Sequence, residues 1–251
     1  MSGTRILAIL WLLGTGALIV MPFAGVGDGF RLYYSNAGQV SVSFISAMIC
    51  FSTMNAFPSE SALGKVWGAI AAGILAWAIA AAIFASYPLL NGGKDTPFPY
   101  YSDIFYLMTS PLMTVGLLMF KRSSGLESPL WGKMLALVAL LGTGFMAYRA
   151  NAEGLTDPDL TLKLTTMGYF AFDPILFSVT LLTASSFRGG DVAASWWFVV
   201  AGILLYYVSN QLYNYLVISE QYTTGSPIDA GWMLGFGLIA CGAIRAKKLL
   251  G

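Results

Sequence analysis

The sequence predicts an all-α protein, a polytopic integral membrane helical bundle with about eight transmembrane helices. Hydrophobic residues make up 57% of the 251 residues and charged residues only 10%, whereas about a quarter of the residues in a soluble domain are charged. A membrane-spanning helix needs about 20 apolar residues. The chain offers such segments at 6–26, 40–57, 66–87, 103–120, 131–148, 162–186, 194–218 and 229–246. No long linker separates them, so residues 1–251 are predicted to form a single transmembrane helical domain.

The first three segments differ in character. Segment 6–26 is long and is not followed by a clear A-x-A cleavage site, so we interpret it as a retained helix and not as a signal peptide. Segment 40–57 carries several serines and an asparagine and is expected to face protein, not lipid. Segment 66–87 is rich in alanine and glycine, which let helices approach closely, and it is expected to pack centrally without chemistry of its own.

Alternate connections lie on the side opposite the N-terminus. The longest of these connections are expected at 27–39, 88–102 and 149–161. Asp103 and Asp229 stand near the first turns of the fourth and eighth segments, where a carboxylate is favoured by the helix dipole. A helix cap is therefore one interpretation of both acids. The tryptophans near segment ends are expected to form aromatic belts without a functional role: Trp11, Trp131, Trp196, Trp197 and Trp232.

The distribution of lysine and arginine predicts the orientation. Eight spans place both termini on one side, which carries nine basic residues against four on the other. The more basic side faces the cytoplasm. We therefore expect a plasma-membrane protein with cytoplasmic N- and C-termini and an acidic outer surface.

The composition also excludes several kinds of chemistry. The chain has no histidine, which rules out histidine-ligated haem, histidine-containing zinc sites and Ser-His-Asp catalysis. The net charge of +1 argues against binding to nucleic acid. Cys50 and Cys241 are expected to be free thiols in apolar surroundings. We therefore expect no metal site and no enzyme, while the sequence leaves any cofactor open.

Asp173 is the most unusual polar residue. It lies about 16 Å into the segment 162–186 at ~1.5 Å per residue, close to the membrane midplane, and Pro174 follows it and is expected to bend the helix. An intramembrane acid is a functional-site candidate by default; the alternative is a purely structural bond between helices. We expect Asp173 to bond a tyrosine or an amide such as Asn210.

Further polar residues gather in the outer halves of the neighbouring segments. They predict a small-molecule pocket that opens to the outside, with Asp173 as its floor, tyrosines as its walls and Arg149 as a counter-ion. Tyrosine suits such a wall because its ring is apolar and its hydroxyl can bond a ligand. The predicted ligand-binding residues are Asp103, Tyr106, Asp173, Tyr206, Asn210, Tyr213, Asn214 and Asp229.

Three stretches carry a resemblance to a known family: PFPYYSDIFYLMTSPLMTVGLL, GYFAFDPILFSVTLL and YYVSNQLYNYLVISEQYTTGSPIDAGWMLGFGLIA. In this order they resemble the multi-pass N-terminal membrane sensor region of bacterial and archaeal diguanylate cyclase (GGDEF), phosphodiesterase and histidine kinase proteins, over residues 40–246. Asn210 departs from the family, which often has aspartate there. The matching positions are Asp103, Tyr106, Asp173, Tyr213, Tyr222, Gly225, Asp229 and Trp232.

The resemblance implies a non-enzymatic sensor or receptor-like module. No cyclase or kinase sequence follows AIRAKKLLG, so signalling is expected to run through a protein partner, a second copy of the chain or an absent output domain. One alternative is an ion- or proton-coupled transporter or channel that uses Asp173. Another is a structural subunit of a membrane complex. Apart from the lipid bilayer, the expected partners are a small molecule from the outer side and such a protein.

Overall fold

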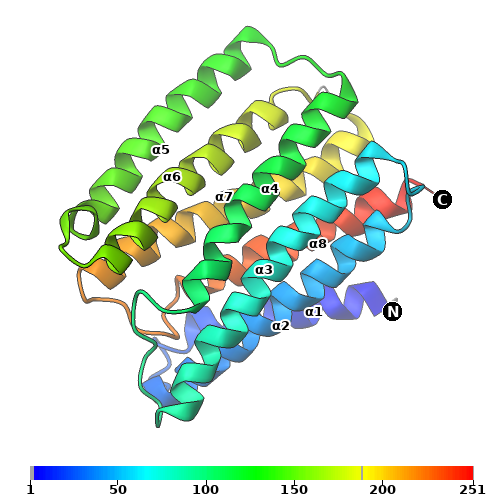
Figure 1. Cartoon of the computed structure of the whole chain (residues 1–251). Coiled ribbons are helices and arrows are strands. Elements are labelled where there is room, and N and C mark those ends of the chain that lie inside the picture. The colour runs from blue at the N-terminus through cyan, green and yellow to red at the C-terminus, as the bar shows by residue number, and fades with distance from the viewer. Residues whose placement is uncertain (1–2, 188, 251) are drawn as a thin grey trace.

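The computed structural model describes residues 3–187 and 189–250, and in this part of the chain the regular structure is entirely helical. Consecutive helices run antiparallel to one another (Figure 1). The helices are α1 Gly3–Val20, α2 Asp28–Met54, α3 Ala62–Leu90, α4 Ser102–Ser124, α5 Leu130–Thr156, α6 Leu160–Ala184, α7 Gly190–Ile218 and α8 Asp229–Lys248.

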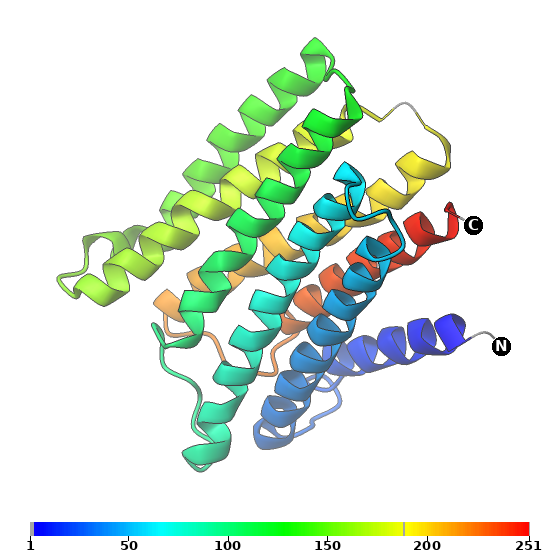
Figure 2. The same cartoon turned by 45° about the vertical axis from the view of Figure 1, so that its right-hand side comes forward.

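Six of these helices form a closed ring. They pack in the order α2, α3, α4, α6, α7 and α8, and α8 packs against α2 again. Helix α5 lies outside the ring on α6 and α7, and α1 lies outside it on α2 and α8; the two stand at opposite edges of the bundle (Figures 1 and 2). Both labelled chain ends lie at one end of the bundle (Figure 1). We call this the terminal end, and we call the opposite end the distal end.

The helices are longer than hydropathy predicts. The expected connection 27–39 is wrong, because α2 already begins at Asp28. Ser35, Asn36 and Gln39 are buried on the inner face of this added part, so its polarity marks contact with protein and not a loop. The expected connection 149–161 is likewise reduced, because α5 continues to Thr156. Helix α6 continues through Pro174, and the bend there stays a prediction.

Length and composition support a multi-pass membrane protein. Helices α2 to α7 are each long and apolar enough to cross a membrane. Helices α1 and α8 are not among them; the apolar part of α1, Arg5–Val20, is shorter. Helix α8 is nevertheless a member of the ring, and 11 of its 20 residues are buried. Because other helices cover much of its surface, such a helix can be less apolar than a helix that faces lipid.

Glycines set the closest helix contacts. A Cβ atom on Gly202 of α7 would lie 2.4 Å from the carbonyl oxygen of Gly235 on α8, and one on Gly235 would lie 2.8 Å from the carbonyl oxygen of Gly202. Helices α3 and α4 approach similarly, since a Cβ atom on Gly73 would lie 3.0 Å from the carbonyl oxygen of Thr109. The expected close packing of segment 66–87 is thus confirmed. Because backbone lies against backbone, these pairs of helices have little room to slide apart.

We expect Gly202→Ala to destabilise the protein, because the added methyl group meets the α8 backbone and overpacking of this kind costs about 1–3 kcal/mol. The matched control is Gly142→Ala on α5, where a Cβ atom meets nothing within 4 Å. Alanine favours a helix over glycine, so the control should be neutral or stabilising. Apparent melting temperatures in detergent measure both, and equal melting temperatures for the two variants would contradict this account of the α7–α8 contact.

Candidate functional site

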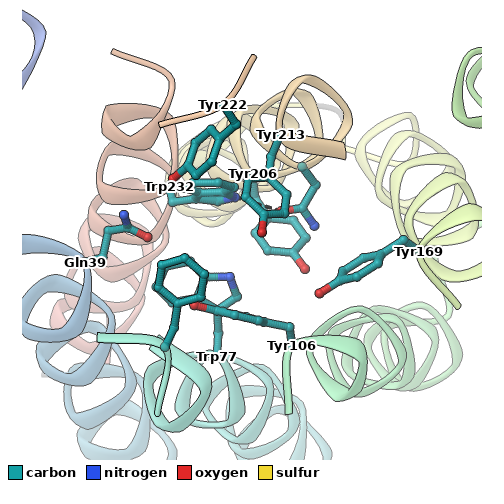
Figure 3. A pocket seen from close by; sticks show the side chains of 10 residues that line it. Gln39, Trp77, Tyr106, Tyr169, Tyr206, Tyr213, Tyr222 and Trp232 are labelled. Carbon is teal, nitrogen blue, oxygen red and sulfur yellow. Dashed lines mark hydrogen bonds between the residues drawn. The ribbon is translucent and has the colours of Figure 1, made fainter. Parts of the chain in front are cut away.

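An aromatic pocket lies inside the helix ring. Its lining comes from α2, α3, α4, α6, α7, α8 and the α7–α8 connection, and the side chains converge on one centre (Figure 3). It encloses a cavity of about 30 Å³, room for about two water molecules. The lining residues are Gln39, Trp77, Phe84, Tyr106, Tyr169, Tyr206, Asn210, Tyr213, Tyr222 and Trp232. They lie in the middle or distal parts of their helices, so the pocket belongs to the distal half of the bundle.

Ring-to-ring contacts hold this wall together. The Trp77 ring lies edge-on to Tyr106 at 5.3 Å and packs on Trp232 at 6.0 Å, measured between ring centroids. Tyr213 contacts both Trp232, at 5.6 Å, and Tyr222, at 4.8 Å. Edge-to-face aromatic pairs at these separations are favourable beyond the area that they bury. The wall is therefore built before any ligand arrives.

Behind the wall, Asp173 is the centre of a hydrogen-bond network that joins four helices. Its carboxylate accepts from Ser110 Oγ of α4 at 2.6 Å and from Asn210 Nδ2 of α7 at 3.0 Å. The Ser110 hydroxyl also lies 3.2 Å from the Tyr206 hydroxyl. On its other side, Asn210 accepts from Trp232 Nε1 of α8 at 2.7 Å. The expected bond between Asp173 and Asn210 is therefore present.

The two other buried carboxylates lie at the distal ends of α4 and α8. Asp103 accepts from the Tyr100 backbone N–H at 2.7 Å and from the Tyr169 hydroxyl at 2.6 Å. Asp229 accepts from the Gly225 backbone N–H at 2.8 Å and from the Tyr222 hydroxyl at 2.9 Å. Each acid therefore bonds a backbone N–H group that precedes its helix and also holds a tyrosine of the pocket wall. Neither acid is the N-cap residue: Tyr101 and Ile228 hold those positions without a side-chain cap bond, so the cap interpretation is not confirmed.

Ser35 of α2 supplies Asp229 with a further donor, at 2.6 Å, and Ser35 in turn accepts from Gln39 Nε2 at 2.9 Å. Tyr222 lies in the α7–α8 connection, outside the spanning helices. Burial, followed by the nearby Asp229 carboxylate, raises the pKa of Tyr222 well above its ordinary value. The Tyr222 hydroxyl is thus kept protonated as a donor to Asp229.

The first four and last four helices repeat this arrangement. Helices α4 and α8 each carry an acid in the first turn. Each acid accepts a bond from the helix next to it in the ring, Asp103 from Tyr169 of α6 and Asp229 from Ser35 of α2. Four residues further along those two helices lie Asp173 and Gln39. The pocket therefore lies between two corresponding sets of ring helices, α2 to α4 and α6 to α8, whereas α1 and α5 pack differently.

The predicted site residues divide into two groups. Tyr106, Tyr206, Asn210 and Tyr213 line the cavity as expected. The three acids do not: Asp103, Asp173 and Asp229 stand one hydrogen bond behind lining side chains, so the predicted carboxylate floor is wrong in this detail.

Asn214 and Arg149 are also placed differently from the prediction. Asn214 is fully buried but does not line the pocket, and neither its Oδ1 nor its Nδ2 has a hydrogen-bond partner among the described residues. Arg149 lies exposed on α5 and forms no ion pair with the described residues, so it is not the counter-ion that the sequence suggests.

Several lining residues were missed by sequence reasoning. Trp77 and Phe84 belong to the helix expected to lack chemistry, and Trp232 was assigned to an aromatic belt; all three face the cavity. Of the other tryptophans, Trp131 and Trp197 are exposed as a belt requires, whereas Trp196 is buried. A signal for the lining was present in the spacing: Trp77 and Phe84, like Tyr206 and Tyr213, are seven residues apart and share a helix face.

Within the described residues, no group of three or more cysteine, aspartate or glutamate side chains could hold a metal ion. Cys50 is buried and Cys241 half-buried, and both are free thiols. The polar groups of this site can accept and donate hydrogen bonds, and its rings can present aromatic faces to a ligand. Comparison of the chain with protein-family models, with curated proteins and with solved structures gave no match.

We expect Asn210→Asp to destabilise the protein strongly. The variant loses the donor to Asp173 and places a second carboxylate against it, and uncompensated buried charge of this kind costs on the order of 3 kcal/mol or more. Asn55→Asp, at an exposed position just after α2, is the matched control. Melting temperatures at pH 7 provide the comparison, and an Asn210→Asp variant as stable as the control would refute the role given to the Asn210 amide.

Proposed function

We propose that this protein is a non-enzymatic membrane sensor, a receptor-like module that takes up a small molecule from outside the cell in its aromatic pocket. It passes the signal to a protein partner or an output domain. The observation that carries the proposal is the network behind the pocket, in which one carboxylate, Asp173, is bonded to side chains of α4 and α7 and, through Asn210, to α8.

Through this network a bound ligand can change how the helices pack. A molecule that displaces Asn210 or Trp232 alters the bonds of Asp173 and so changes how α6 sits against α7 and α8. Helices α7 and α8 are locked backbone to backbone at Gly202 and Gly235, so they move as one body. Helix α8 ends at the terminal end of the bundle with Arg245, Lys247 and Lys248 in its last turn, where a partner can detect the movement.

The proposal includes eight spans, cytoplasmic termini and a plasma-membrane location. Membership of α8 in the ring supports its crossing the membrane beside α2 and α7. Two side-chain bonds attach α1 along the bundle, Trp11 Nε1 to the Met233 carbonyl oxygen and the Tyr34 hydroxyl to the Gly14 carbonyl oxygen, both at 2.8 Å. The excess of basic residues on the terminal side supports its cytoplasmic orientation.

A transporter is the second candidate, and one observation favours it. Asp173 lies near the middle of α6. Buried polar atoms without a hydrogen-bond partner among the described residues lie on α5, α6 and α7, which pack together. They are Asn151 Oδ1, Thr166 Oγ1, Gln211 Oε1 and both polar atoms of the Asn214 side chain. Buried polar groups without partners are typical places for bound water. A hydrated route of this kind would give protons access to Asp173.

The topology has a direct test. A tag after residue 251 should be labelled only from the cytoplasmic side, and a tag in the connection 91–101 only from outside. Membrane-impermeant reagents applied to intact cells and to inverted vesicles distinguish the two. Labelling of both tags from one side would eliminate the eight-span model.

Asp173→Asn tests the sensor mechanism, because it keeps the shape of the side chain and removes its charge. We expect a compound that raises the melting temperature of the native protein, found by screening small polar molecules, to lose at least half of that shift in the variant. Spin labels at Lys65→Cys and Lys247→Cys, with Cys50 and Cys241 replaced, should report a ligand-dependent change in separation that Asp173→Asn abolishes. Glu153→Gln on the exposed part of α5 is the control. An undiminished shift and an unchanged label response would reduce Asp173 to a structural bond between helices.

A further inference from the structure

We infer that the ligand of the aromatic pocket is an organic cation of the quaternary ammonium class. This inference rests on the proposed receptor function and specifies its ligand. It is carried by two independent features of the site: the chemistry of the wall and the charge behind the wall.

The pocket wall consists mainly of aromatic side chains. Eight of its ten residues are aromatic, and the two others, Gln39 and Asn210, carry neutral amides. A cation within about 6 Å of an aromatic ring centroid is attracted by the ring quadrupole, and cages of aromatic rings recognise methylated ammonium groups. Neighbouring rings of the wall contact one another, with centroids 4.8–6.0 Å apart, so they form a continuous aromatic surface around the cavity.

The charge behind the wall is negative. Asp103, Asp173 and Asp229 are 6%, 2% and 0% exposed. None of them takes part in the ion pairs of the described residues, which join Arg31 to Asp28, Lys65 to Glu60 and Arg245 to Asp191. No lysine or arginine is among the residues lining the cavity. The site thus concentrates three acids without a side-chain counter-ion.

Hydrogen bonds connect two of these acids directly to rings of the wall. Asp103 accepts from Tyr169 and Asp229 accepts from Tyr222, and both tyrosine rings line the cavity. A phenol that donates to a carboxylate is polarised, which makes the face of its ring more negative. The arrangement therefore strengthens the attraction of these rings for a cation.

Helix dipoles offset only part of the negative charge. Asp103 and Asp229 stand in the first turns of α4 and α8, and each helix N-terminus contributes about half a positive charge. Asp173 lies in the middle of α6 and has no such compensation. Three carboxylates thus face about one unit of positive charge in total, so the electrostatics of the pocket favour a cation.

The chemistry of the wall decides which cation. A metal ion needs several oxygen, nitrogen or sulfur ligands, and the described residues contain no cluster of that kind. A primary ammonium group has three donors to satisfy, whereas the wall offers mainly carbon surface. A trimethylammonium group has no donor and carries its charge on methyl groups, and both properties match the wall. It is larger than the cavity of about 30 Å³, so its entry displaces lining side chains, which is the movement that the receptor mechanism requires.

Choline and 3,3-dimethyl-1-butanol form the decisive pair of probes, because they have the same shape and differ only in charge. We expect the purified protein in a neutral maltoside detergent to bind choline at least about 30-fold more tightly than the alcohol, measured by titration calorimetry and by quenching of tryptophan fluorescence. Asp173→Asn should weaken choline binding about tenfold and leave binding of the alcohol unchanged.

Variants of Tyr213 separate the ring from its hydroxyl, which makes no hydrogen bond to the described residues. Tyr213→Phe keeps the π face and should bind choline as the native protein does, whereas Tyr213→Leu should lose about tenfold. Trp197→Leu, on the exposed surface of α7, is the control for folding and fluorescence.

Equal affinity for choline and the alcohol would overturn the cation assignment, and so would the absence of choline binding by folded protein. Either result leaves the receptor proposal intact, because the library screen with Asp173→Asn tests that proposal without assuming a charge. A pocket that binds no member of the library would refute the receptor proposal itself.

Discussion

The bond between Trp232 and Asn210 is the constraint on which the rest of the site depends. An indole N–H can only donate, so the amide oxygen of Asn210 must face Trp232 and its NH₂ group must face Asp173. The 2.7 Å and 3.0 Å distances agree with this assignment. One donor on α8 thereby determines what a side chain of α7 offers to an acid on α6. The same bond connects the pocket wall, through Trp232, to the buried acid and so joins three helices.

This constraint also explains why an amide and not a carboxylate stands at position 210. With Trp232 as donor on one side and a carboxylate on the other, the residue must accept and donate at once, which an ionised aspartate cannot do. The chain therefore keeps one acid at this level of the bundle and places the other two at helix starts. An amide keeps the acids separated, so the network is complete without a proton shared between carboxylates.

Much of the fold followed from the sequence, because apolar segments of about 20 residues have few alternatives in a membrane. The helix count and the antiparallel order could be predicted in this way. The distal parts of α2 and α5 could not, since hydropathy does not distinguish a polar residue facing water from one facing another helix. Ser35 and Asn151 are buried examples. The site shows the same limit: Tyr206 and Tyr213 were identified by their helical spacing, whereas the same seven-residue spacing of Trp77 and Phe84 was obscured by the alanine-rich segment around it.

The three acids stand out in the sequence, but their relation to the cavity depends on tertiary geometry. Which side of a tyrosine faces the cavity and which side bonds a carboxylate is decided by the packing of three helices, and no local pattern carries that information. Tyr169 and Ser110 illustrate this, because each becomes important only through a partner more than 60 residues away in the chain.

The similarity of the two four-helix halves has an evolutionary consequence. Four antiparallel helices return the chain to the side from which it began, so a duplicated half inserts in the same orientation as the first. Gene doubling then needs no reversal of loop charge, whereas doubling a unit of three or five helices would invert the second copy. In a pocket made by two identical chains, both sides would have to change together. Because both sides of this pocket belong to one chain, a carboxylate at Asp173 can stand where the other side has an amide at Gln39, and an asymmetric ligand can be bound in a single direction.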